Sequence, residues 1–150
     1  MTRRQIKKQI AELLLKDDFP KAFEKIKSLP VITAINSLFS FLYSQDEKIK
    51  NRAVDAMGAL VAGLAENDME QARNIMRRLM WNLNSESGGI GWGAAEAMGE
   101  IMANSEKLAN EYRKILYSYM MPGGNFIENI SLQKGVLEGI KRLESPKGHW

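Results

Sequence analysis

The stretch that decides the fold occurs twice, as IKNRAVDAMGALVA (Ile49–Ala62) and as IGWGAAEAMGEIMA (Ile90–Ala103). The second copy starts 41 residues after the first, and both contain Ala-Met-Gly with a further Ala four residues later. A weaker copy, LQKGVLEGIKRL, starts at Leu132, and a fainter one, IKKQIAELLLK, starts at Ile6. A period of about 40 residues with helical apolar spacing is typical of stacked helix pairs, an α-solenoid.

The sizes of the residues at the aligned positions have a physical explanation. A helix pair cannot bury its apolar face alone, so successive pairs stack and need small residues at the closest approach. We expect this role for Ala56, Ala97 and Gly139. We expect the larger residues that follow them to fill the layer between repeats: Met57, Met98 and Ile140.

The rest of the chain also reads as helix after helix, broken at Asp, Asn, Pro and Gly clusters, with no alternating strand pattern. The predicted fold class is all-α, a right-handed α-α superhelix of about three helix pairs preceded by N-terminal helices. The last helix is expected to start near Glu128. As one domain, the chain divides into capping helices (1–29), three repeats (30–65, 66–104 and 105–144) and a tail (145–150).

The composition makes several kinds of catalytic and metal-binding site unexpected. The 150 residues include no Cys, and the one His is His149, so thiolate and histidine catalysis and metal sites of those types are not expected. We expect no catalytic residue, no metal and no cofactor. The chain contains no apolar run long enough to span a membrane and no signal-peptide pattern, which predicts a cytoplasmic protein.

Charge is unevenly placed along the chain. The net charge is +4 over residues 1–50, −3 over 51–100 and +2 over 101–150. Arg73, Arg77 and Arg78 form a basic face on one helix, with Glu70 one turn before Arg73 and able to pair with it. We interpret this as a solvated face. A dedicated nucleic-acid binder usually has a denser basic stripe.

The two best copies resemble the second helix of HEAT repeats, in particular the short bacterial and archaeal HEAT-like repeats. The resemblance covers about residues 30–144, and Asp46 stands where such repeats often carry an acid. The second copy departs at its start, where Gly91, Trp92 and Gly93 replace a basic, a polar and a basic residue. The resemblance implies a curved stack, second helices along the concave side and, in most such families, a protein-binding role.

The segment SESGGIGWG (Ser85–Gly93) falls in the register of the inter-helix turn of the previous repeat. A dinucleotide-binding fingerprint needs a strand before it, whereas RRLMWNLN before this segment reads as a helix. One interpretation is close packing or a left-handed turn. The other is an anion-binding helix N-terminus at Gly88, Gly89 and Gly91, with Trp92 as an apolar platform.

We predict partner-binding residues on the second helices, where Trp92 aligns with polar residues and Trp is common at interfaces. Asp55, Glu96 and Glu138 share one aligned position. They either line a groove for a basic partner or form salt bridges between repeats with Arg52 and Lys134. The predicted partner-binding residues are Trp92, Glu96, Asn51, Arg52, Asp55 and Lys134.

The resulting expectation is a non-catalytic scaffold that binds a protein through its concave surface. The alternative is a nucleic-acid-binding HEAT-like protein, resembling the alkylpurine DNA glycosylases built from such repeats, with Trp81 as a further aromatic residue. An enzyme resembling the phycobilin lyases is left open, while HEAT-like di-iron hydroxylases need His-Glu pairs that the chain lacks. The C-terminal repeat still looks internal, so either the tail ESPKGHW packs over that end or its exposed face pairs with a second copy, and we favour the homodimer.

Overall fold

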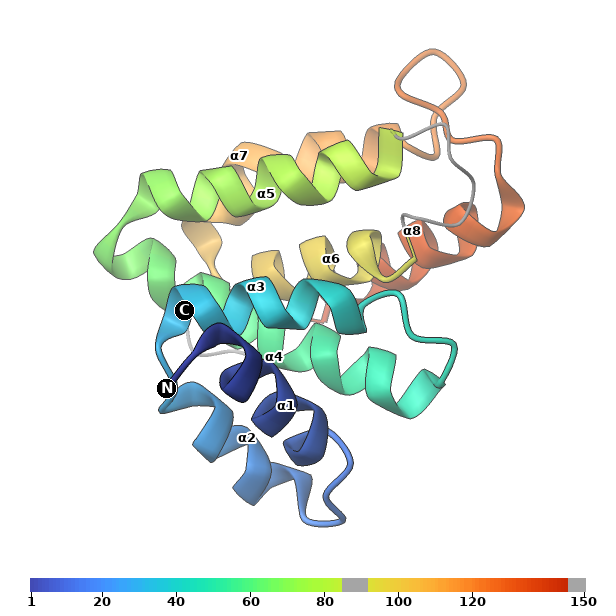
Figure 1. Cartoon of the computed structure of the whole chain (residues 1–150). Coiled ribbons are helices and arrows are strands. Elements are labelled where there is room, and N and C mark those ends of the chain that lie inside the picture. Colours follow the sequence, from blue (N-terminus) through green and yellow to red (C-terminus); the bar gives the residue numbers. More distant parts are fainter. Residues whose placement is uncertain (85–91, 146–150) are drawn as a thin grey trace.

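The computed structural model describes residues 1–84 and 92–145 (Figure 1). Within these residues the chain forms eight α-helices and no β-strand, which confirms the predicted all-α class. The helices are α1 (Arg3–Leu13), α2 (Phe19–Lys27), α3 (Val31–Phe41), α4 (Glu47–Asn67), α5 (Met69–Asn84), α6 (Ala94–Asn104), α7 (Glu106–Ser118) and α8 (Ile130–Leu143). In this part of the chain, no helix is long and apolar enough to cross a membrane.

Polar residues at the predicted breaks start several helices. The side chains of Asp46, Ser105 and Asn129 each accept a hydrogen bond from a backbone N–H in the first turn of the following helix. These caps satisfy N–H groups that have no partner inside the helix. Because Asn129 is the cap, α8 begins at Ile130, slightly later than the predicted start near Glu128.

The helices lie in two rows: a first row of α1, α3, α5 and α7, and a second row of α2, α4, α6 and α8. α3 packs against α4, α5 against α6, and α7 against α8, so neighbours in sequence pair in space. In the second row α4 contacts α6, and α6 contacts α8. In the first row α1 contacts α3, Arg78 of α5 donates a hydrogen bond to Asn36 of α3, and Arg73 of α5 pairs with Glu111 of α7. The two best copies of the repeated stretch, in α4 and α6, therefore lie next to each other.

The core occupies the space between the rows. Ala56, Met57, Ala97 and Met98 have no exposed surface, as their places in the repeat predict. Ile140, their counterpart in the third copy, is half-buried and packs against the edge of the core. It is less enclosed because, within the described residues, no further second-row helix follows α8.

The closest approach in the second row is between α6 and α8. A Cβ atom added at Gly99 would overlap the backbone carbonyl of Gly139, and one added at Gly139 would overlap that of Ala95. On the other side of α6, a Cβ at Gly58 would overlap the side chain of Glu100. Glycine at these positions lets the helices approach more closely than side chains would permit.

Candidate functional site

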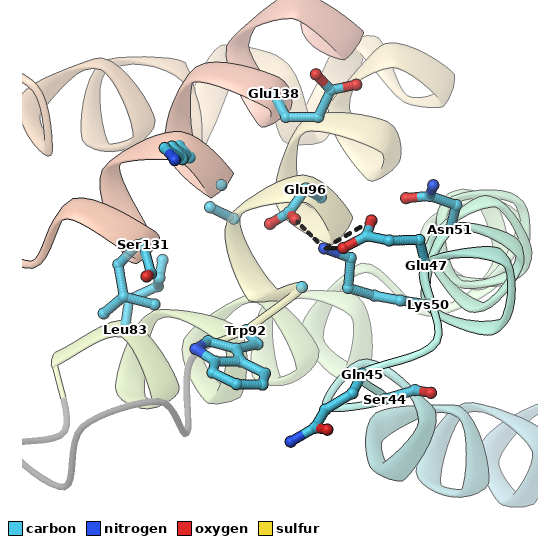
Figure 2. Close-up of a pocket in the computed structure, with 15 residues that line it drawn as sticks. Ser44, Gln45, Glu47, Lys50, Asn51, Leu83, Trp92, Glu96, Ser131 and Glu138 are labelled. Carbon is cyan, nitrogen blue, oxygen red and sulfur yellow. Dashed lines mark hydrogen bonds and ion pairs between the residues drawn. The ribbon is translucent and has the colours of Figure 1, made fainter.

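A cleft of about 520 Å³ opens on the second row, bounded by the starts of α4 and α6 and the first half of α8. Figure 2 shows its residues, with Glu96 near the centre and Trp92 and Glu138 toward opposite ends of the view. Apolar surface comes from Leu83, Ala95 and Leu132 as well as from the Trp92 ring. The cleft therefore combines an aromatic ring, aliphatic side chains and charged groups in one hollow.

The start of α6 is fixed by Gly93. This residue is the N-cap of α6 and has φ of 79°, in the left-handed region that glycine adopts without strain. A Cβ here would lie 2.5 Å from the carbonyl oxygen of Leu42 at the end of α3. The left-handed turn predicted for this segment is therefore found at Gly93, and it holds Trp92 and the first turn of α6 against α3.

Glu96 forms the floor of the cleft and is only 5% exposed. Its Oε2 lies 3.3 Å from Nζ of Lys50, which also lies 3.4 Å from Oε2 of Glu47. Lys50 is thus shared between a buried carboxylate on α6 and an exposed one on its own helix (Figure 2). Burying a carboxylate is costly without a cation, so this pair makes the charged floor possible.

Gly135 of α8 faces the same carboxylate. A Cβ at this position would lie 2.7 Å from Oε1 of Glu96. The missing side chain leaves room for the carboxylate between α6 and α8 and keeps this part of the cleft open. Sequence analysis missed Gly135 and Lys50, although both stand at aligned positions of the repeat beside residues that it selected.

Four of the six predicted partner-binding residues line this cleft: Trp92, Glu96, Asn51 and Lys134. Trp92 is half-buried and packs against the core, so one part of its ring remains accessible. The predicted anion-binding glycines Gly88, Gly89 and Gly91 lie outside the described residues.

Arg52 lies elsewhere, toward α1 and α2. Its guanidinium donates hydrogen bonds to the backbone carbonyls of Leu14 (2.9 Å) and Lys16 (2.8 Å) just beyond the end of α1. It also lies 4.7 Å from the ring centroid of Phe19. These contacts give Arg52 a structural role in attaching the N-terminal helices to α4.

Asp55 also lies outside the cleft. Its Oδ1 accepts a hydrogen bond from Arg142 (2.8 Å), and the same Arg142 nitrogen donates to Oε1 of Glu100 (3.0 Å). Glu100 is 3% exposed, so Arg142 of α8 bridges a buried carboxylate on α6 and a more exposed one on α4.

The aligned acids Asp55, Glu96 and Glu138 therefore differ in their surroundings. Asp55 and Glu96 make ion pairs between repeats, as one of the two interpretations predicted, but the cations are Arg142 and Lys50. The prediction that Arg52 and Lys134 pair with these acids was wrong. Arg52 points to α1, and Lys134 pairs with no carboxylate in the described chain. Glu138 is exposed on the wall of the cleft.

The cleft has no arrangement for metal binding. In residues 1–84 and 92–145, no group of three or more His, Cys, Asp or Glu side chains is placed to hold a metal ion. Chemically, the cleft can present mixed charge and an aromatic surface to a side chain or a peptide.

Comparison with known proteins gives little further guidance. No family model matches the chain, and no solved structure is significantly similar to it. An uncharacterized protein from Archaeoglobus fulgidus is 35% identical over 85 residues, which cover 54% of this chain and 43% of that protein. The chain thus spans less than half the length of this archaeal relative.

Proposed function

We propose that this protein is a HEAT-like α-solenoid that binds a segment of another protein in the cleft of its second row. The observation that carries the proposal is the convergence of aligned repeat positions on one hollow. Asn51 of α4, Trp92 before α6 and Lys134 of α8 occupy the same repeat position, and all three line the cleft.

The arrangement of the helices supports this assignment. Each sequence pair packs as a pair, and α4, α6 and α8 follow one another along the second row. In a solenoid, the equivalent faces of successive repeats form an extended binding surface. The cleft lies on such a face, since its three helices each contribute their N-terminal half.

The chemistry of the cleft favours a peptide with a basic residue beside an apolar one. Glu47, Glu96 and Glu138 outnumber Lys50 and Lys134, and Lys50 is already shared between two of the carboxylates. An exposed Glu138 is therefore available to a Lys or Arg of the partner. The accessible face of Trp92 provides an apolar or cation–π contact for the neighbouring residue.

A peptide library displayed on phage tests the proposal directly. We expect panning against the whole chain to enrich peptides that combine a Lys or Arg with an adjacent apolar residue. A synthetic peptide from that selection is then titrated against variants of the cleft. Glu138→Lys and Trp92→Ala should each weaken its binding about tenfold or more, because the first reverses the charge that faces the basic residue and the second removes an aromatic anchor.

Two variants make the result decisive. Glu138 is exposed, so Glu138→Lys tests the cleft without disturbing the core on which Trp92 packs. Trp81 is 75% exposed on α5 of the first row, and Trp81→Ala should leave the affinity of the peptide unchanged. A selection with no enrichment, or binding that Glu138→Lys and Trp92→Ala do not weaken, would exclude the cleft as the binding site.

A further inference from the structure

A second hollow lies on the first row, and none of its lining residues lines the cleft on the second row. It has a volume of about 490 Å³ and lies between α1, α3 and α5, where Figure 1 shows α3 between the other two. Its charged residues are Arg3, Arg4 and Lys7 of α1 and Arg78 of α5. Its remaining lining comes from hydroxyl and amide side chains of α3: Thr33, Asn36, Ser37 and Ser40.

The positive charge of this hollow is not neutralised. Within residues 1–84 and 92–145, none of its four cations forms an ion pair with a carboxylate, and α3 carries no charged residue. Arg73 and Arg77 of α5 differ, since both pair with Glu70; with Arg78 they are the three residues predicted to form a solvated face. Arg78 points instead toward α3.

Arg78 is held in place without a counter-charge. Its guanidinium lies 3.9 Å from the ring centroid of Phe39, and one nitrogen donates to Oδ1 of Asn36 at 2.6 Å. A guanidinium has five N–H donors in a fixed plane, so most of them remain for an anionic ligand. Fixing the side chain in advance lowers the entropy that binding would cost.

An aromatic hollow continues from the basic one. It has a volume of about 390 Å³, shares Asn36, Ser40 and Arg78, and adds Phe39, Tyr43, Trp81 and Asn82. Trp81 is 75% exposed, although its indole is one of the largest apolar groups in the chain. Asn82 donates a hydrogen bond to the hydroxyl of Tyr43 at 2.7 Å, which stabilises the wall beside it. We call the two joined hollows the basic–aromatic surface.

We propose that the basic–aromatic surface binds single-stranded nucleic acid. The phosphates would lie along Arg3, Arg4, Lys7 and Arg78, and a base would stack on Trp81. Unpaired cations beside an exposed aromatic ring are the combination used for single strands, in which stacking supplies affinity with little sequence preference. The proposal does not depend on the function assigned to the second-row cleft.

Other anionic partners fit this surface less well. An acidic peptide would use the cations, but it would leave the exposed Trp81 face without a matching planar group. An anionic membrane would meet a hollow lined with Ser, Thr and Asn side chains and one large exposed ring. Membrane-binding surfaces instead present a broad apolar face.

The test measures binding of labelled oligothymidine and oligouridine of about 12 nucleotides, a length within the range of known single-strand sites. Four phosphate contacts should make the logarithm of affinity fall with the logarithm of salt concentration at a slope of about −3. The triple variant Arg3→Gln, Arg4→Gln, Lys7→Gln should reduce that slope to about −1. All three residues are exposed, so the fold should be unaffected.

Stacking is tested separately at Trp81. Trp81→Ala should weaken binding about tenfold with little change in the salt slope, whereas Trp81→Phe should keep most of the affinity. In a Trp150→Phe background, bound oligonucleotide should quench tryptophan fluorescence, and it should do so much less once Trp81→Phe is added, because the remaining Trp92 lies on the other row.

The matched control neutralises three exposed lysines away from this surface, Lys107, Lys114 and Lys141 on α7 and α8. This control should bind the oligonucleotide like the wild type. An equal loss of affinity in both triple variants would show that net charge alone causes the effect, and it would overturn the proposed site. The proposal is also overturned if no salt-dependent binding is found. Equal or tighter binding to poly-glutamate, or to vesicles rich in phosphatidylserine, would overturn it as well.

Discussion

Tyr119, which follows α7, carries a buried hydroxyl group. The residue is 1% exposed, and its oxygen has no hydrogen-bond partner among the described residues. An unpaired buried hydroxyl costs free energy, so Tyr119→Phe should raise the free energy of unfolding at neutral pH by about 1 kcal/mol. Chemical denaturation at pH 7 measures this, and a variant less stable than the wild type would contradict it.

The same residue predicts a loss of stability in alkali. Burial raises the pKa of Tyr119 to about 12, whereas an unfolded tyrosine ionises near pH 10. Between these values only the unfolded state loses the proton, so rising pH favours unfolding by about 1.4 kcal/mol per unit. Tyr119→Phe should remove this contribution and flatten the decline from pH 10 to 12. Parallel declines in the two proteins would show that the phenol does not contribute.

Two glycines in helix interiors should respond in opposite ways to the same substitution. Gly99→Ala places a methyl group on the backbone of Gly139, so α6 and α8 must separate, and we expect a loss of about 3 kcal/mol. Gly63 faces open space, and Gly63→Ala should stabilise the protein by about 0.5–1 kcal/mol through helix propensity alone. Urea unfolding compares the two, and a tolerated Gly99→Ala would refute the close helix contact.

At the scale of elements, Arg52 attaches the end of α1 to α4. Arg52→Met removes two charged hydrogen bonds to carbonyls that have no other helical partner, so we expect a loss of about 2 kcal/mol in unfolding free energy. Arg52→Lys keeps the charge but not the fork of donors, and it should lose less. Arg73→Met, which breaks exposed ion pairs with Glu70 of α5 and Glu111 of α7, should cost less unfolding free energy than Arg52→Met.

The outcome of this series also separates two roles for Arg52. If the residue acts only through α1, Arg52→Met changes the unfolding free energy but not the affinity of a peptide for the second-row cleft. Loss of peptide affinity in a variant that remains folded would restore the role in partner binding that sequence analysis gave it.

Helix periodicity explains which site residues sequence analysis located. Asn51 and Lys134 occupy one aligned position with Trp92, and equivalent positions on neighbouring helices face the same side, so the repeat brings them together. Arg52 is the next residue along α4 and is rotated by about 100° around the helix, toward α1. Its equivalents Gly93 and Gly135 do line the cleft, so the difference comes from the neighbours of α4, where Leu14, Lys16 and Phe19 engage the Arg52 side chain.

Other features depend on contacts that no local pattern encodes. Arg142 reaches Asp55 and Glu100, which lie 87 and 42 residues earlier in the sequence. The basic–aromatic surface adds α1 to equivalent positions of α3 and α5, such as Ser40 with Trp81 and Ser37 with Arg78. The residue types differ between these equivalent positions, so comparing repeats did not reveal the surface. The sequence showed only its components, a basic N-terminus and a helix rich in arginine.

At the scale of the whole molecule, the second row is held together by polar bridges as well as by glycine contacts. Lys50 joins α4 to α6, and Arg142 joins α8 to both of them. Each bridge has at least one carboxylate that is nearly inaccessible, Glu96 or Glu100, so losing its cation would leave a buried charge. We therefore expect α4, α6 and α8 to unfold together and not one at a time.

The C-terminal edge of the second row leads to the last prediction, a homodimer. Ile130 and Leu137 are 69% and 54% exposed and lie seven residues apart on α8, hence on one face. An exposed apolar helix face favours association with a second copy. Light scattering should show a mass that rises above 16.9 kDa with concentration, while Leu137→Glu should remain at that value. A wild-type mass of 16.9 kDa at all concentrations would rule out pairing through this face. That result would mean that the area buried between two such helices is too small to offset the entropy of association.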